Sequence, residues 1–416
     1  MGLTIHATVS PGVERKIVYA GASASFETAR THLHELADLE VSSQRIRRLT
    51  LAVAKQRDEE RKKDVNEYDA LPIPKQSYGK PDKVVAPPIA CVMVDGGRLQ
   101  IRDRIVAQVA EIDKVETNEA ASLSIRKGKH WRESRVGCAL SMQGPKHADD
   151  PMPLLPSFLK DIPAISKLLG EMGHGAALDL NLEGFSLESQ PKSDDWPCPD
   201  VLVRSVVATR ETWADFGKML ASEAWKRGFG ASQRKAFVAD GSSNNWSVHS
   251  RYFPQYTPIL DILHALGYCY QAATASRRND EGVIVYLRWA QLIWSGKVTE
   301  VVKELKVRQL ELGETPPDVG DDDPRRQVSR ARTYFENQAS RMNYPQYRKQ
   351  GLPITSSQIE STIKQINQRV KGSEKFWSSC GGNGMLGLRA DIISDTKPLQ
   401  AFWKRRAQSI DLQLCT

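Results

Sequence analysis

The sequence predicts a mixed α/β fold, with an α+β mixed sheet that follows a helical N-terminal region and is interrupted by helices. Short apolar runs with strand character alternate with helical periods over residues 89–264. Helical periods alone occupy residues 25–63 and 265–345. The length of 416 residues also exceeds that of a common single domain, so two or three structural units are expected.

The N-terminal region, residues 1–64, is expected to hold two helices that bind DNA. Ser25 can cap the first helix and Ser42 the second. The short joint at 37–41 suits a helix-turn-helix, and a plain helical hairpin with a soluble face is the alternative. Apolar residues recur in both helices at three- and four-residue spacing: Phe26, Ala29, Leu33 and Leu36, then Ile46, Leu49 and Val53.

The rest of the chain divides into five segments. A linker at 65–88 carries five prolines, which interrupt any helix or central strand. The first part of the sheet domain is expected at 89–264, the all-helical insertion at 265–345, the last part of the sheet domain at 346–405 and a tail at 406–416. Strands are predicted at 90–94, 135–142, 201–208, 235–239 and 258–260, with a helix at 212–226 and an amphipathic helix opening near 357.

The net charge of +8 is concentrated in two clusters. Residues 42–63, which include Arg45, Arg47 and Arg48, carry eight Lys/Arg against three acids, and residues 341–375 carry seven against two. Such clustering is the electrostatic pattern of a polyanion binder, and solvated helix faces are the alternative.

Other features exclude several classes of protein. The six cysteines form no CxxC pair and show no zinc-ligand spacing, so we expect a reducing, cytoplasmic location. No apolar run reaches about 18 residues and the N-terminus lacks a signal-type apolar core, so no membrane partner is expected.

Three carboxylates stand where strands and a helix can bring them together. Asp95 and Asp240 each end a short apolar run, and Glu360 lies in the first turn of the late amphipathic helix. Converging carboxylates repel one another unless a cation neutralises them, and hard oxygen ligands suit Mg²⁺ or Mn²⁺. Two such ions can activate a water or a 3′-hydroxyl and stabilise the leaving oxygen of a phosphodiester.

Each carboxylate also has a structural interpretation. Asp95-Gly96 fits a hairpin turn, and Asp240 fits a strand-to-helix turn. Ser357 and Glu360 fit a capping box. The tryptophans are expected in the core rather than as base-stacking platforms: Trp246, Trp289, Trp294 and Trp377.

A series of motifs runs in order along the chain. They are Val94-Asp95-Gly96-Gly97-Arg98-Leu99-Gln100, Ala239-Asp240-Gly241, Ile259–His264, Tyr334–Asn337, Arg341–Tyr344, Tyr347-Arg348, Gly351–Ile354, Ile359–Ser361, Arg369–Ser373, Trp377 and Leu386–Arg389. This series, over about residues 25–405, resembles the ISKra-type group of bacterial insertion-sequence transposases, which are relatives of the Mutator-like transposases. These proteins have an RNase H-like catalytic domain with a DDE motif.

The resemblance implies a role for each matched residue. Asp95, Asp240 and Glu360 match the catalytic acids, which would hold two Mg²⁺ or Mn²⁺ ions. Asp261 and His264 match an element that shapes the site, with Asp261 as a reserve ligand. The helical insertion would contact transposon-end DNA. Basic residues of the second cluster would contact phosphates: Arg348, Lys364, Arg369, Lys371 and Lys375.

The implied activity is DNA transposition by a nucleoid-associated homo-oligomer. The protein would bind terminal inverted repeats, cut the 3′ ends and join them to target DNA. Thr355-Ser356-Ser357-Gln358 lacks the glycine that the group usually has between the serines, and the segment before residue 25 is shorter than in the group. The alternatives are an inactive or repurposed DNA-binding derivative and an RNase H-like structure-selective nuclease.

Overall fold

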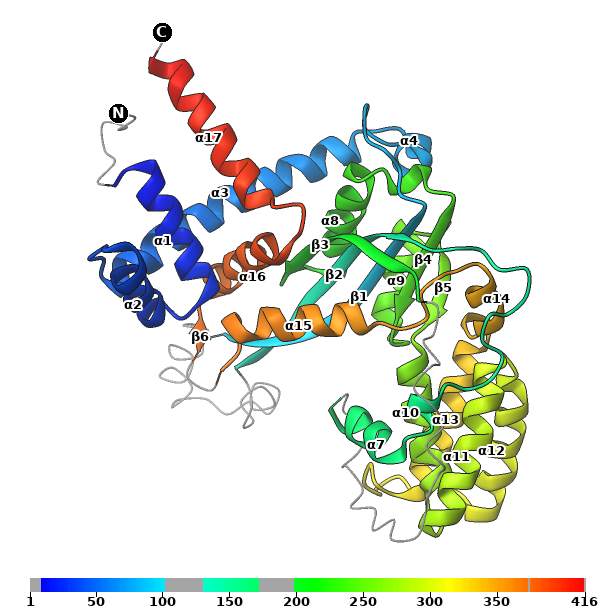
Figure 1. The fold of residues 1–416 in the computed structure, drawn as a ribbon. Coiled ribbons are helices and arrows are strands. Elements are labelled where there is room, and N and C mark those ends of the chain that lie inside the picture. Colours follow the sequence, from blue (N-terminus) through cyan, green and yellow to red (C-terminus); the bar gives the residue numbers. More distant parts are fainter. Residues whose placement is uncertain (1–8, 102–129, 172–197, 373–374, 415–416) are drawn as a thin grey trace, which may run out of the picture.

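The computed structural model describes residues 9–101, 130–171, 198–372 and 375–414. Six strands lie within these residues: β1 (Ile89–Ile101), β2 (Trp131–Gln143), β3 (Asp200–Thr209), β4 (Arg234–Ala239), β5 (Thr257–Leu260) and β6 (Phe376–Trp377). They form one mixed sheet with the order β3-β2-β1-β4-β5, and β6 pairs with the end of β1. β2 lies between β1 and β3 and is antiparallel to both, whereas β4 is parallel to β1 and β5 to β4. The predicted mixed α/β class is therefore confirmed (Figure 1).

The central strand β1 carries the first of the predicted carboxylates. Residues 89–94 are buried because strands flank β1 on both sides and helices cover the sheet. The strand continues without a turn through Asp95 and Gly96, which pair with Val136 and Arg135 of β2. The hairpin-turn interpretation of Asp95-Gly96 is therefore wrong.

Helices cover both faces of the sheet. Adjacent residues of a strand point to opposite faces. A Cβ atom on Gly137 would lie 2.9 Å from Leu220 Cδ2 of α8 (Trp213–Lys226). The next residue, Cys138, faces α15 (Ser357–Val370), and its Sγ lies 3.2 Å from Thr362 Oγ1. Both helices agree with the predicted ones, and Thr212 caps α8.

Four helices precede the sheet: α1 (Pro11–Ser23), α2 (Phe26–Ala37), α3 (Ser43–Asp69) and α4 (Ile73–Tyr78). Ser25 and Ser42 cap α2 and α3, as predicted. α1, which the spacing did not indicate, packs on both and shares a small core of Ile17, Ala29, Leu33 and Ile46. The predicted stripe of α2 ends one turn early, because Leu36 is 83% exposed. The segment 65–88 is also less extended than a linker, since it contains the end of α3 and all of α4.

A group of helices follows β5 and lies at the opposite end of the molecule from α1 and α2 (Figure 1). The group comprises α10 (Ile262–Thr274), α11 (Asn279–Trp294), α12 (Val298–Leu312), α13 (Pro324–Gln338) and α14 (Tyr344–Lys349). Trp289 and Trp294 are buried in its core, and Trp246 and Trp377 are buried elsewhere, so these four tryptophans are core residues as predicted.

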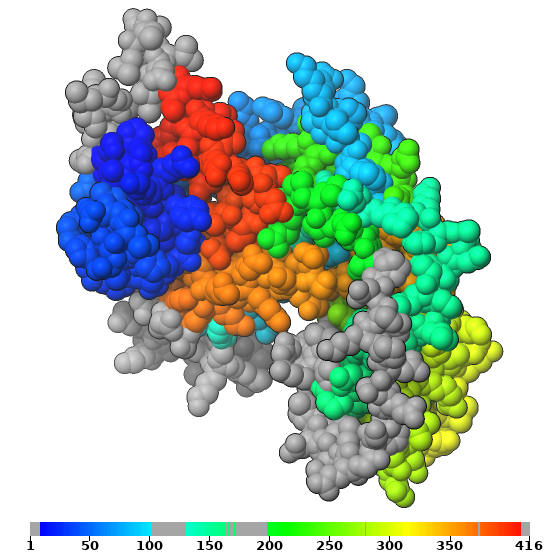
Figure 2. Space-filling view, viewed as in Figure 1, coloured from blue at the N-terminus to red at the C-terminus, as the bar shows by residue number. Residues whose placement is uncertain are grey.

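Further helices complete the described chain: α7 (Ile162–Glu171), α9 (Ser243–Tyr252), α16 (Ser379–Ile393) and α17 (Pro398–Leu414), with short 3₁₀ turns at Ser157–Leu159, Phe229–Ala231 and Ala339–Arg341. In Figure 2 the N-terminal helices adjoin the C-terminal ones, which lie beside α15. Within the described residues, no helix combines the length and the apolar character needed to cross a membrane.

Candidate active site

Three aspartates lie side by side across the parallel part of the sheet. The register of β1 and β4 runs to Met93 and Val238, which places Asp95 beside Asp240. The register of β4 and β5 in turn places Asp240 beside Asp261. The sheet therefore brings together two of the three predicted catalytic acids and the predicted reserve ligand.

Asp95 carries a carboxyl group whose charge is disfavoured by its surroundings. Burial and then repulsion from Asp240 raise the pKa of Asp95 to about 7, although the backbone N–H of Gly96 donates a hydrogen bond of 2.6 Å to Asp95 Oδ1. Glu360 adds further repulsion. Two carboxylates that share a site in this way accept either a proton or a cation.

Asp240 is held in place from both sides of its loop. Its Oδ1 accepts hydrogen bonds from the backbone N–H of Ser242 at 2.9 Å and from Nδ2 of the buried Asn245 at 2.8 Å. The first bond belongs to the predicted strand-to-helix turn, so Asp240 makes that turn as well as facing Asp95. Sequence reasoning missed Asn245, whose only signal is its place in the first turn after the Asp-Gly-Ser motif.

Helix α13 braces the loop that carries Asp240. Tyr334 donates a hydrogen bond of 2.8 Å to the carbonyl oxygen of Asp240, and Gln338 donates one of 3.1 Å to that of Gly241. Gly241 has φ +98°, and a Cβ atom there would lie 2.8 Å from the Tyr334 ring. Tyr334 also stacks on Tyr268, with ring centroids 3.9 Å apart. Helix α13 therefore supports the loop that carries Asp240.

A buried hydrogen-bond network links Asp261 to Glu360. Asp261 caps α10, and its two oxygens accept hydrogen bonds from the N–H groups of Leu263, His264 and Ser356, from the Ser356 hydroxyl at 3.0 Å and from His264 Nδ1 at 2.6 Å. The Ser356 hydroxyl also lies 3.4 Å from Glu360 Oε1. With so many donors on it, Asp261 fits a positioning role better than that of a metal ligand.

The charges of this network support one another. Burial, the largest single influence, opposes ionisation of both members of the Asp261–His264 pair, but their mutual hydrogen bond and attraction, together with the other hydrogen bonds and charges around them, outweigh it. The pKa of Asp261 is therefore lowered, and that of His264 is raised to about 9. Burial and the Asp261 carboxylate raise the pKa of Glu360.

Glu360 does not form the predicted capping box. Helix α15 begins at Ser357, and the residue before the helix, Ser356, makes no side-chain cap. Ser356 faces Asp261 and Glu360 instead. Asp261, His264 and Glu360 each offer a ligand atom within 4.8 Å of the others. Asp240, His264 and Glu360 all shift the pKa of Asp95, and Asp261 shifts those of His264 and Glu360, so the five predicted site residues are close enough to interact electrostatically.

A groove of about 830 Å³ opens beside Asp95 and Asp240. Ile363 and Asn367, on one face of α15, form part of its wall, and Lys371 follows directly after the helix. The other lining side chains include Arg98, Trp131, Glu133 and Trp213. Lys371 Nζ lies 5.5 Å from the centre of the Trp131 ring. The groove thus offers cationic and aromatic groups next to the carboxylates.

The predicted DNA contacts fall into two groups. Arg47, Arg48, Lys364 and Lys371 are exposed, and Arg45 and Lys375 are half-buried. In contrast, Arg348 and Arg369 are each 2% exposed. Arg348 forms an ion pair with Asp150 and lies over Trp294, while Arg369 donates to the Gly21 carbonyl at 2.9 Å and stacks between Phe26 and Trp377. The prediction that these two arginines contact DNA is corrected, because their guanidinium groups are held inside the protein.

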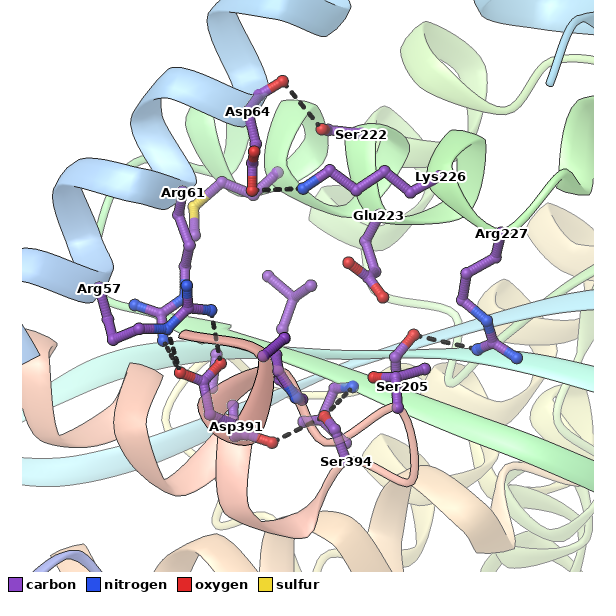
Figure 3. Close-up of a pocket in the computed structure, with 18 of the residues that line it drawn as sticks. Arg57, Arg61, Asp64, Ser205, Ser222, Glu223, Lys226, Arg227, Asp391 and Ser394 are labelled. Atoms are coloured by element: carbon purple, nitrogen blue, oxygen red, sulfur yellow. Dashed lines mark hydrogen bonds and ion pairs between the residues drawn. The ribbon is translucent and has the colours of Figure 1, made fainter. Parts of the chain in front are cut away.

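The first basic cluster is also partly neutralised by internal ion pairs. Figure 3 shows Arg57 and Arg61 of α3 directed at Asp391 of α16. Lys226 of α8 pairs with Asp64 of α3 in the same view. Arg57 and Arg61, in the second half of α3, are therefore used in packing on the sheet domain. Arg47 and Arg48, in its first half, are exposed to solvent.

Replacement of Arg369 is expected to affect stability and not DNA affinity. Arg369→Met removes a buried hydrogen bond and two cation–π contacts, so we expect a loss of about 1–3 kcal/mol in the free energy of unfolding. Lys371→Met should leave stability unchanged and weaken DNA binding several-fold. Urea denaturation measures stability, and fluorescence anisotropy with labelled DNA measures affinity. An Arg369→Met variant that is stable but binds DNA weakly would show that Arg369 contacts DNA after all.

Asp95→Asn is expected to stabilise the protein at alkaline pH in EDTA. The folded-state pKa of Asp95 is about 7, above the unfolded value near 4, so the folded chain binds more protons between these values. Stability then falls as the pH rises through this window. The melting temperature of the variant should exceed that of the wild type at about pH 8, with a smaller difference near pH 5. A difference independent of pH would exclude the raised pKa of Asp95, and Asp322→Asn in an exposed loop is the control.

No protein-family model matches this chain, and no curated protein matches it.

Proposed function

We propose that this chain is a DNA transposase of the DDE type, with an RNase H-like catalytic domain built from residues 89–264 and 346–405. The strand order and directions support such a domain, because β2 is antiparallel to its neighbours β1 and β3, and β4 and β5 are parallel to β1. The helices of 265–345 are then an insertion that contacts transposon-end DNA. The observation that carries the proposal is the strand register that sets Asp95 beside Asp240 at the groove, with Glu360 near enough to raise the pKa of Asp95.

The residues present fit a pair of hard divalent cations. Asp95, Asp240 and Glu360 offer carboxylate oxygens, and the raised pKa values of Asp95 and Glu360 reflect charge that a cation would stabilise. We infer that these three acids hold Mg²⁺ or Mn²⁺. When bound, two such ions supply activation of the attacking hydroxyl and stabilisation of the leaving oxygen.

Other side chains of the site have roles that follow from their contacts. Asn245 orients Asp240, and Ser356 links Glu360 to the Asp261–His264 pair. Lys371 attracts a phosphodiester into the groove, and Trp131 offers an apolar surface against a sugar or base. The groove wall formed by α15 thus positions the DNA strand beside Glu360, which the same helix carries.

The function is tested on DNA that carries the inverted repeats flanking the gene. The purified chain should nick these repeats at their 3′ ends only with Mg²⁺ or Mn²⁺, and transfer the ends to target DNA. Glu360→Gln should abolish both steps, whereas Glu314→Gln, at an exposed position, should not. Binding without cleavage by the wild type would favour a repurposed DNA-binding protein. Cleavage of branched DNA of any terminal sequence would favour a structure-selective nuclease.

A further inference from the structure

A basic pocket lies at the end of the sheet where β1 and β4 begin, which is opposite the end that carries the carboxylates. β1 and β4 begin at this end and β2 ends there, because Ile89 pairs with both Arg234 and Met142. Five residue steps along β4 separate Arg234 from Ala239, which is about 17 Å in an extended strand. The pocket has a volume of about 540 Å³ and shares no lining residue with the catalytic groove.

The described residues that line this pocket include no carboxylate. Its charged lining consists of Lys146, Arg234, Lys235 and Lys349, and His147 and four glutamines complete most of its polar surface. Arg234 is fixed by donating to the carbonyl oxygens of Gln350 at 2.8 Å and Gly144 at 2.7 Å. Burial lowers the pKa of both Arg234 and Lys235, as expected of cations without a nearby counterion. The lining therefore favours an anion.

Two buried polar atoms of the pocket have no hydrogen-bond partner among the described residues. They are the hydroxyl oxygen of Ser232, a residue that is 6% exposed, and Nε2 of His147. Buried polar groups in folded proteins are usually hydrogen-bonded, and both of these groups can donate a hydrogen bond to an oxyanion.

An aromatic residue stands at the rim of the pocket. Tyr78 is 65% exposed, and Lys235 Nζ lies 5.4 Å from the centre of its ring. An exposed ring beside a cationic pocket suits a phosphate that carries an adjacent base. We propose that this pocket binds a backbone phosphate of a nucleic acid strand and that Tyr78 contacts the neighbouring nucleoside. The proposal rests on the proposed function in taking this strand to be DNA, at a place separate from the strand to be cut.

The test is DNA binding by the full chain in EDTA, where no cleavage occurs. The double variant Lys146→Gln/Lys349→Gln should bind a labelled duplex about tenfold or more weakly than the wild type at moderate salt. The slope of log affinity against log salt should fall by roughly 1, since the contact with one phosphate is lost. Lys397→Gln/Lys404→Gln, with the same change of charge at exposed positions near α17, should change neither value. Tyr78→Ala and Ser232→Ala should each weaken binding several-fold without lowering the melting temperature.

Three results would overturn this inference. Unchanged affinity and salt slope in the pocket double variant would remove the phosphate contact. Equal losses in the control double variant would show a general effect of net charge. Inorganic phosphate or a mononucleotide that competes as strongly as the oligonucleotide would assign the pocket to a free phosphate compound. If the wild type cleaves DNA normally and any of these three results is obtained, only the phosphate-binding inference is rejected. If the variants bind DNA as expected but the wild type does not cleave it, only the transposase activity is rejected.

Discussion

Asp391→Asn is expected to lower the free energy of unfolding by about 3–5 kcal/mol, the cost of removing one partner from a buried ion-pair network. Asp391 is 5% exposed and accepts hydrogen bonds from Arg57 Nε at 2.9 Å and Arg61 Nη2 at 2.8 Å. Arg57 is also 5% exposed, so the variant would leave its charge buried with a weaker partner. Arg61 additionally donates to the Gly387 carbonyl at 2.8 Å, which ties α3 to α16.

The matched control for Asp391 is Asp58→Asn on α3. Asp58 pairs with Lys62 at 2.9 Å, but the Lys62 side chain is exposed and that of Asp58 is only partly buried, so a loss of at most about 1 kcal/mol is expected. Chemical denaturation followed by circular dichroism measures both variants. The Asp391 variant should also expose α3 to limited proteolysis. Equal effects of the two substitutions would contradict the view that Asp391 locks the N-terminal helices to the sheet domain.

Asp240→Asn is expected to reduce DNA cleavage at least about 10³-fold, the scale of losing an essential group from a catalytic set that acts as a unit. The asparagine oxygen can still accept from the Ser242 N–H and from Asn245 Nδ2, so the loop geometry should persist. The loss of repulsion should lower the pKa of Asp95 towards its ordinary value. The melting temperature should therefore be unchanged or higher while activity disappears.

Asn245→Ala separates ligand orientation from ligand charge. It removes the 2.8 Å hydrogen bond to Asp240 Oδ1 but leaves all the acids in place. The expected loss of activity is about 10–100-fold, as for other groups that orient a ligand, and raising the Mn²⁺ concentration should partly restore it. Single-turnover cleavage over a metal titration gives both values. An Asp240→Asn variant that retains wild-type cleavage would remove Asp240 from the catalytic set.

Much of the sheet could be predicted because several strands contain short apolar runs, two of which end at an Asp-Gly pair. The run before Asp95 and the run before Asp240 became β1 and β4, and their parallel register places the two acids together. The amphipathic spacing of Ile359, Ile363, Ile366 and Val370 likewise predicted α15, and all of these except the partly buried Ile363 lie in the core. Sequence spacing could not show that these elements meet, because the register between strands depends on the whole sheet.

The errors share a physical cause. Arg348 and Arg369 look like surface cations in a basic cluster, but aromatic rings and carbonyl oxygens in distant segments bury them. Arg57 belongs to the other cluster and is neutralised by Asp391, more than 300 residues away. The partner of a buried cation cannot be identified from neighbours in the chain. The bracing of the Gly241 loop by Tyr334 depends on the same long-range packing.

We infer that Asp95, Asp240 and Glu360 together bind divalent cations. Crystals of the wild type soaked in Mn²⁺, with anomalous diffraction collected at the manganese edge, test this binding. We expect manganese in contact with the carboxylates of Asp95 and Asp240 and with that of Glu360, and its loss in Asp240→Asn. Manganese bound only by Asp261, His264 and Glu360, or no manganese at any of these residues at millimolar concentration, would exclude a cation site formed by the three acids.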